Sequence, residues 1–185
     1  MEVERGGPVL YAVDLDGTLL SDDARLSPTS RALLLPLVEE GMPIAVASAR
    51  SVVAIRKLLA GLPLALPAIE FNGAFLSEVS TGRHLWTCAL PAEVAAAILD
   101  LARTAGQSPF VSTFDGERDR LYAPPSLNPG MDWYLGERRA ATDERLTPVA
   151  DVAAALADEI VCFTVIGEEA ALRDLEGEVR ARWDG

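Results

Sequence analysis

Two aspartates stand two residues apart in the segment DLDGTLL, which begins at Asp14 and follows the apolar run VLYAV. Side chains alternate along a strand, so Asp14 and Asp16 can face the same side while Leu15 faces the core. Gly17 lets the backbone leave the strand sharply, and Thr18 adds a hydroxyl. Two carboxylates this close repel each other. The pair is tolerable if a hard cation such as Mg²⁺ binds both, or if the two divide roles, so that one attacks phosphorus while the other transfers a proton. A solvated acidic loop is the alternative, but it does not explain the apolar run before the pair.

The segments around this pair predict a parallel α/β sheet. Short apolar runs at residues 9–14, 43–48 and 68–72 are typical of strands buried on both faces. Helical signals at 27–40 and 51–61 lie between the runs, as crossover helices do. Ligands of such sheets bind beyond the carboxyl ends of the strands, and the aspartate pair stands at one of those ends.

The segment DLDGTLL on a first buried strand resembles motif one of the haloacid dehalogenase superfamily. The resemblance implies a Mg²⁺-dependent phosphatase or phosphotransferase with a Rossmann-like fold. It assigns Asp14 as the nucleophile and Asp16 as the general acid and base. It also implies that both aspartates take part in the metal site, Asp16 through its backbone carbonyl.

Two further segments resemble the sugar-phosphatase branch of this superfamily, often called Cof-type. In IAVASAR, Ser48-Ala49-Arg50 stands where the branch usually has Thr-Gly-Arg, so Ser48 is the hydroxyl expected to bind the phosphoryl group. In EFNGAFL, Asn72-Gly73 stands where the branch has Asn-Gly just before its cap domain. A helix N-cap for Ser48, a surface charge for Arg50 and an ordinary turn for Asn-Gly are the simpler alternatives. The implied substrate- and phosphate-binding set is Thr18, Ser48, Arg50, Asn72 and Gly73.

The resemblance predicts the fold class and the domains. We expect an α/β protein with a Rossmann-like parallel core sheet, incomplete, and an inserted α+β cap domain. Residues 1–77 are assigned to the N-terminal part of the core and 78–185 to the cap. A hairpin is predicted over 74–88, and an irregular segment between 123 and 159.

Two motifs of the superfamily are not found in the sequence, namely a lysine after the cap and a second acidic pair. Lys57, the sole lysine, falls inside the second core helix, and DGERD at 115–119 is better explained as a hairpin turn. We therefore expect a C-terminally truncated chain with a core sheet of three strands. Such a sheet would expose an edge, which predicts self-association.

Composition narrows the classes of partner. The net charge of −12 argues against a nucleic-acid or anionic-membrane partner, because both are bound through an excess of Lys and Arg. The N-terminus lacks the pattern of a signal peptide, so a cytoplasmic location is expected. Cys88 and Cys162 are expected to be buried free thiols. His84 is the sole histidine, which disfavours a Ser-His-Asp mechanism.

Together these features and the resemblance predict a Mg²⁺-dependent phosphomonoester hydrolase of small phosphorylated metabolites, with sugar phosphates as the expected class, acting through an aspartyl-phosphate. The small-molecule phosphate ester is the expected partner. A sugar phosphotransferase or phosphomutase on the same fold is one alternative. A catalytically inactive truncated chain is the other, because the lysine and the second acidic pair stabilise charge in the transition state.

Overall fold

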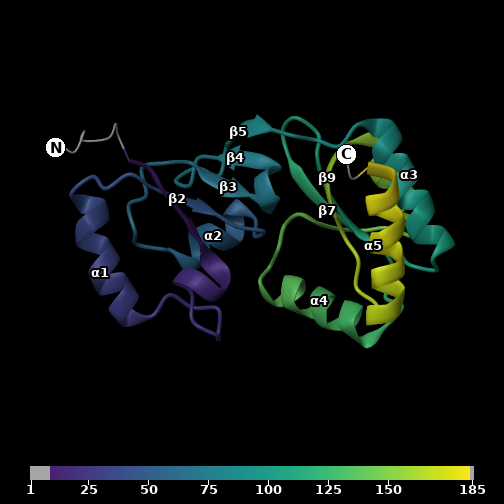
Figure 1. Ribbon diagram of the computed structural model, residues 1–185, viewed down its shortest axis with the longest axis horizontal. Helices are drawn as coiled ribbons and strands as arrows, with labels where there is room; N and C mark the ends of the chain where they lie inside the picture. The colour runs from purple at the N-terminus through teal and green to yellow at the C-terminus, as the bar shows by residue number, and fades with distance from the viewer. Residues whose placement is uncertain (1–8, 184–185) are drawn as a thin grey trace, which may run out of the picture. The chain divides into compact units, whose positions relative to one another are not determined.

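The computed structural model describes residues 9–183, which form two compact units. One unit ends at Cys88 and the other begins at Ala89. The first contains a five-stranded sheet and the second a four-stranded sheet (Figure 1). No helix within residues 9–183 is long and apolar enough to cross a membrane. Both cysteines are free thiols, as predicted, but the predicted burial is wrong, because Cys88 is exposed and Cys162 is only partly buried.

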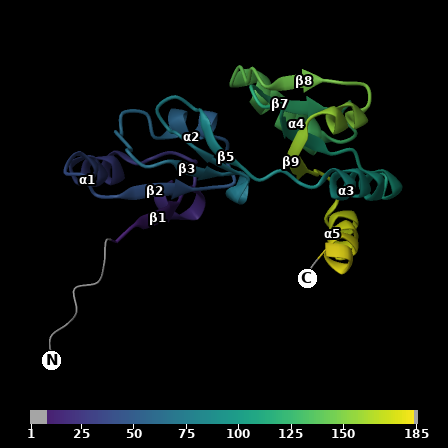
Figure 2. The ribbon, with the colours of Figure 1, turned by 90° about the horizontal axis from the view of Figure 1, so that it is seen from above.

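The first unit is built on a mixed sheet with the strand order β1-β2-β3-β4-β5 (Figure 2). Its strands are β1 (Tyr11–Asp14), β2 (Ile44–Ala47), β3 (Ala68–Glu70), β4 (Phe75–Ser77) and β5 (His84–Thr87). β1, β2 and β3 are parallel, as predicted, and the helices α1 (Pro28–Glu39) and α2 (Val52–Leu58) connect them. Two short helical turns, η1 (Leu15–Leu19) and η2 (Phe71–Gly73), follow β1 and β3.

The predicted hairpin exists, but it extends the first sheet. β4 pairs antiparallel with β3, and β5 pairs antiparallel with β4. The prediction of a three-stranded core sheet is therefore wrong, because the hairpin adds two strands to the edge that β3 would have exposed. The assignment of residues 1–77 to the core and 78–185 to the cap stays a prediction.

The core of the first unit is formed by residues of the parallel strands and of the segments that connect them. Leu15, Val46, Ile55 and Ala68 are almost completely buried there, together with leucines of the connecting segments. β1 itself departs from the prediction of a strand buried on both faces, since Tyr11 is 47% exposed. An apolar run identifies a strand, but its burial depends on what packs outside it.

The second unit combines a sheet of order β8-β7-β6-β9 with helices. Its elements are α3 (Ala92–Thr104), β6 (Phe110–Phe114), β7 (Asp119–Ala123), α4 (Pro129–Ala140), β8 (Leu146–Pro148), η3 (Val152–Ala157), β9 (Glu159–Thr164) and α5 (Glu169–Trp183). β6 pairs antiparallel with β7 and β9, whereas β8 runs parallel to β7. The segment predicted to be irregular thus contains a helix, a strand and a 3-10 turn.

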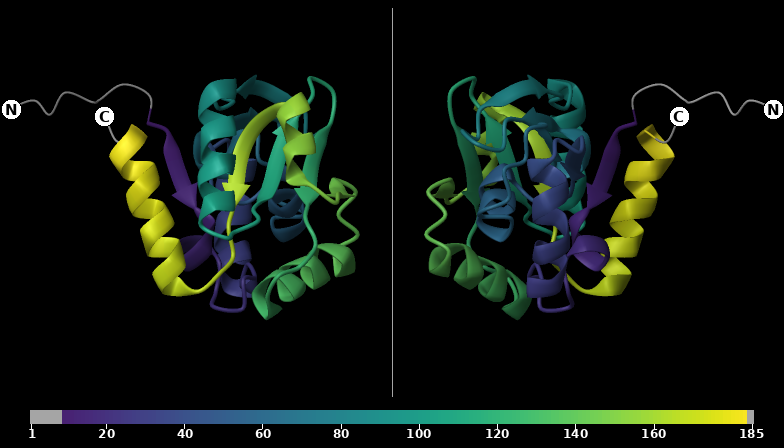
Figure 3. Two further views of the ribbon diagram at one scale, coloured as in Figure 1. Left: turned by 90° about the vertical axis from the view of Figure 1, so that its right-hand side faces the viewer. Right: turned by 90° about the vertical axis from the view of Figure 1, so that its left-hand side faces the viewer.

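Helices pack on both faces of the second sheet. Val111, Tyr122 and Leu99 of α3 belong to one buried cluster on one face. α3 also contacts β9 there (Figure 3). Phe110 and Leu121, next in sequence to Val111 and Tyr122, pack with residues of α4 on the other face. The alternation follows from the two-residue period of a strand and gives this sheet two apolar faces.

Candidate active site

The carboxyl ends of the three parallel strands lie side by side. Asp14 at the end of β1 pairs with Ala47 of β2, and Ala47 pairs with Ile69 of β3. The segments that leave these strands therefore begin at one edge of the sheet. The three motifs identified in the sequence belong to these segments, so the topology brings them to the same place.

The first motif forms a tight turn directly after β1. Leu15 is completely buried, while Asp14 and Asp16 on either side of it are exposed, as the alternation predicted. The Oδ1 atom of Asp14 accepts a hydrogen bond from the Leu15 N–H at 2.7 Å. Gly17 has a φ of 72°, a left-handed conformation that favours glycine, and Thr18 is exposed in the same turn.

Arg50 of the second motif binds Asp16 through two nitrogen atoms of its guanidinium group. Its Nε and Nη2 atoms each donate to one carboxylate oxygen at 2.7 Å. The side chains of Arg50 and Asp16 are 33% and 51% exposed, so solvent still reaches the pair. The hydrogen bonds from Arg50 hold the pKa of Asp16 below its ordinary value, although burial opposes this, and the same contact raises the pKa of Arg50.

Ser48 lies buried at the start of the loop that carries Arg50. It is 6% exposed, and its Oγ atom accepts a hydrogen bond from the Arg50 N–H at 3.2 Å. The N-cap of α2 is Ser51, whose hydroxyl accepts from the Ala54 N–H. The capping role considered for Ser48 from the sequence thus falls to Ser51.

The third motif is tied to the second through the backbone. The Asn72 N–H donates to the Ser48 carbonyl at 3.2 Å, and the Phe71 N–H donates to the Arg50 carbonyl at 3.5 Å. Phe71, Asn72 and Gly73 have φ values of 48°, 55° and 102°. A left-handed phenylalanine is rare, and such backbone conformations persist where the surroundings enforce them, often at functional sites.

The structure therefore joins most of the predicted site residues into one connected group. Arg50 links Asp16 to the Ser48 loop, and Asn72 links that loop to the end of β3. Thr18 and Gly73 lie in the flanking turns. Glu70 adjoins this group and was not among the residues predicted from the sequence. The available signal was an acidic residue inside an otherwise apolar strand.

The two aspartates offer a limited set of ligands for a metal ion. Within residues 9–183, no group of three or more His, Cys, Asp or Glu side chains converges as metal ligands would. Mg²⁺ often binds through one or two carboxylates and completes its octahedral shell with waters and substrate phosphate. Asp14 and Asp16 fit that pattern of donors.

Comparison with known proteins establishes the family. Residues 11–171 match the family model of haloacid dehalogenase-like hydrolases. The chain is 30% identical over 100 residues to the 5-amino-6-(5-phospho-D-ribitylamino)uracil phosphatase YitU of Bacillus subtilis (strain 168), a match covering 52% of this chain and 36% of the relative. It is 36% identical over 90 residues to the HMP-PP phosphatase of Serratia proteamaculans (strain 568), covering 49% of this chain and 32% of the relative.

Solved structures show the same fold. A haloacid dehalogenase-like hydrolase from Bacteroides thetaiotaomicron superposes with a TM-score of 0.67 at 23% identity, covering 94% of this chain and 63% of that one. The predicted fold class is confirmed, and the chain belongs to the haloacid dehalogenase-like hydrolase family. The matches span about a third of the length of the two curated relatives.

Proposed function

We propose that this chain supplies the nucleophile of a Mg²⁺-dependent phosphomonoester hydrolase acting on small phosphorylated metabolites, with sugar phosphates as the substrate class. The observation that carries the proposal is the contact between Asp16 and Arg50 beside Asp14 and the buried Ser48. Both curated relatives described above are named phosphatases, which supports the same activity.

Asp14 is the proposed nucleophile. Its carboxylate is exposed at a strand end, and attack on phosphorus would form an aspartyl-phosphate while the bond from phosphorus to the ester oxygen breaks. Asp16 gives its proton to the departing oxygen. It then takes a proton from the water that attacks the aspartyl-phosphate, so phosphate leaves and Asp14 is restored.

Arg50 has two roles in this proposal. In the free protein it lowers the pKa of Asp16 and so favours the ionised form, which suits the second step but not the first. A substrate phosphate competes for the same planar guanidinium, because Arg binds carboxylate and phosphate in the same two-pronged way. Binding of substrate would thus release Asp16 from Arg50 and let it take up the proton that the first step needs.

A bound Mg²⁺ would offset the negative charge of the phosphoryl group. The Asp14 carboxylate and the Asp16 backbone carbonyl are the proposed protein ligands. The Ser48 hydroxyl is the proposed hydrogen-bond donor to a phosphoryl oxygen.

Hydrolysis of a generic aryl phosphate with and without Mg²⁺ tests this function. Asp14→Asn should lower phosphate release at least about a hundredfold and abolish the acid-trapped, base-labile phosphoenzyme. Asp22→Asn, an exposed acidic residue of the neighbouring loop, is the matched control and should retain the wild-type rate.

Two results would reject the proposal. One is wild-type protein that releases no phosphate at any Mg²⁺ concentration, and the other is an Asp14→Asn variant that keeps the wild-type rate. Interconversion of sugar phosphate isomers faster than phosphate release would instead indicate a phosphomutase.

A further inference from the structure

Glu70 at the end of β3 carries a carboxylate to which the proposed reaction assigns no role. Its side chain is 0% exposed, in the interior of the first unit. An ionised carboxylate is retained in such surroundings when its oxygens are hydrogen-bonded, because the loss of water must be offset. Its partners therefore indicate what it does.

Both oxygens of Glu70 are engaged. Oε2 accepts a hydrogen bond from the N–H of Val52, the first residue of α2. Oε1 accepts one from the Ser77 hydroxyl, and His84 Nδ1 lies 3.2 Å from the same oxygen. One side of the carboxylate thus holds a helix N-terminus, while the other side is held by the hairpin β4–β5.

The hairpin side forms a short chain of donors. The single Ser77 proton goes to Glu70, so the Ser77 oxygen must accept from His84 Nδ1, which lies 2.6 Å away. His84 stacks on Phe75 with a centroid separation of 3.9 Å and an interplanar angle of 7°. Its side chain is 6% exposed, so the imidazole is fixed in place.

This cluster does not have the arrangement of a hydrolytic triad. The Ser77 hydroxyl is buried and donates to the carboxylate, whereas a nucleophilic serine donates to the imidazole and faces substrate. With a triad excluded, the contacts of Glu70 indicate that it holds the neighbouring backbone in place.

That backbone is the loop of the proposed phosphate site. The Ser48 N–H donates to the Ile69 carbonyl at 2.9 Å, so the loop from Ser48 to Val52 is held along its length by the residues around Glu70. We infer that Glu70 is a positioning residue, whose carboxylate fixes the start of α2 and thereby sets where Arg50 meets Asp16. The inference deepens the proposed function and rests on it for its meaning.

The Asp16 carboxyl group reports on this position without requiring turnover. Its pKa is lowered by Arg50, so any change that loosens Arg50 should raise that pKa toward its ordinary value. Glu70→Gln replaces one acceptor oxygen with an amide, which cannot accept from both donors. We expect carbon-detected NMR titration to show a higher Asp16 pKa, and inorganic phosphate to bind about tenfold more weakly.

Val52→Pro tests the same link from the other end, and it decides the question if Glu70→Gln does not fold. Proline removes the N–H that Glu70 binds, yet it is favoured at the first position of a helix. Ser51 before it is already extended, with φ −74° and ψ 155°, as a residue preceding proline should be. Ile44→Val, a mild core change at the other end of β2, is the control and should leave the Asp16 pKa unchanged.

The outcomes separate the two proposals. A raised Asp16 pKa in folded Glu70→Gln or Val52→Pro, with none in Ile44→Val, supports positioning. An unchanged Asp16 pKa in the folded variants overturns it, whatever the activity. If wild-type protein neither binds nor releases phosphate, the proposed function fails, and the Asp16 titration still decides whether Glu70 sets the Arg50 contact.

Discussion

At the scale of single residues, Arg50 holds the pKa of Asp16 below its ordinary value. Two hydrogen bonds of 2.7 Å join them, and the pKa of Asp16 is lowered as a result. Lysine would keep the positive charge of Arg50 but would lose the planar, two-pronged contact. The substitution therefore separates charge from geometry.

Arg50→Lys should raise the pKa of Asp16 toward its ordinary value. The ionised form of Asp16 is the proposed base of the second step, so the acid limb of the pH profile of kcat should move to higher pH where hydrolysis of the aspartyl-phosphate limits the rate. The rate at neutral pH should fall about tenfold or more, because one of the paired hydrogen bonds to phosphate is lost. Carboxyl NMR titration and pH profiles measure both effects.

Arg173→Lys provides the control for this substitution. Arg173 pairs with Glu169 on the exposed surface of α5, in the second unit. The Arg173→Lys substitution should leave the Asp16 titration and the pH profile unchanged. An Arg50→Lys variant that titrates like wild type would contradict the control of Asp16 by Arg50.

The sequence predicted most residues of the candidate site because their spacing follows from local rules. Asp14 and Asp16 were recognisable from the alternation of a strand that ends in a glycine turn, and Ser48 from its place at the next strand end. The partner of each residue was not predictable. The Arg50–Asp16 and Glu70–Val52 contacts join positions far apart in sequence, and their geometry is set by the packing of the sheet.

At the scale of elements, capping signals alone were not enough to predict a helix from the sequence, and apolar residues at helical spacing were also needed. α1 was expected from Ser27-Pro28 and begins there, with the Ser27 hydroxyl as cap. α4 has equivalent signals in Asn128 and Pro129, yet it was missed. Its interior contains two glycines and few apolar residues at helical spacing, so its sequence favours a helix only weakly.

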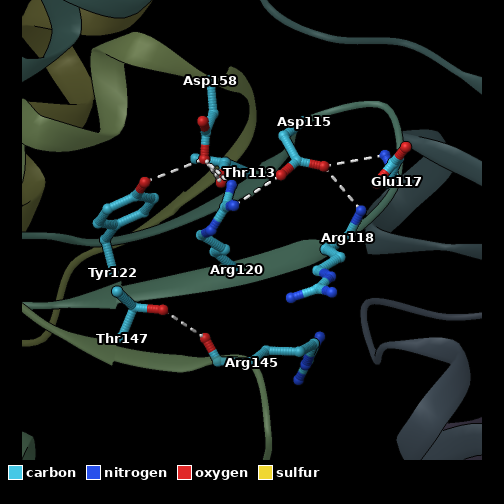
Figure 4. A network of polar contacts seen from close by, with 9 residues as sticks. All are labelled: Thr113, Asp115, Glu117, Arg118, Arg120, Tyr122, Arg145, Thr147 and Asp158. Atoms are coloured by element: carbon cyan, nitrogen blue, oxygen red, sulfur yellow. Dashed lines mark hydrogen bonds and ion pairs between the residues drawn. The ribbon is translucent and has the colours of Figure 1, made fainter.

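A second element-scale feature is the polar network that ties β6 and β7 to the start of β9 (Figure 4). One oxygen of Asp158, Oδ2, accepts hydrogen bonds from Thr113 at 2.9 Å, Arg120 at 2.8 Å and Tyr122 at 3.0 Å. Thr113 is 1% exposed. Its hydroxyl therefore cannot hydrogen-bond to water if Asp158 is removed.

Asp158→Ala should lower the free energy of unfolding of the second unit by about 1–3 kcal/mol, because it leaves buried donors unsatisfied. The Tyr122 pKa is raised mainly by burial and also by Asp158, so it should fall in the variant. Urea unfolding and ultraviolet titration of tyrosine measure these changes. Asp100→Ala on the exposed side of α3 should alter neither, and an equal loss of stability there would contradict this role of the network.

At the scale of the whole molecule, the exposed side of β1 could not be foreseen from its apolar composition. Among residues 9–183, β1 pairs with β2 alone, so its other edge is open. Val9, Leu10 and Tyr11 are 59%, 61% and 47% exposed beside it. Open edges with apolar side chains favour pairing with another chain.

We propose that this edge makes the protein self-associate, and that salt strengthens the association by screening the net charge of −12. Sedimentation velocity over a range of protein concentrations should give a rising average mass, more so at high salt. Leu10→Lys adds a charge at the edge and should shift the protein toward the monomer. Leu127→Lys, at an equally exposed leucine in the second unit, is the matched control and should associate like wild type. A protein that stays monomeric at high concentration and high salt would exclude the β1 edge as an interface, and equal weakening by both substitutions would assign the effect to charge alone.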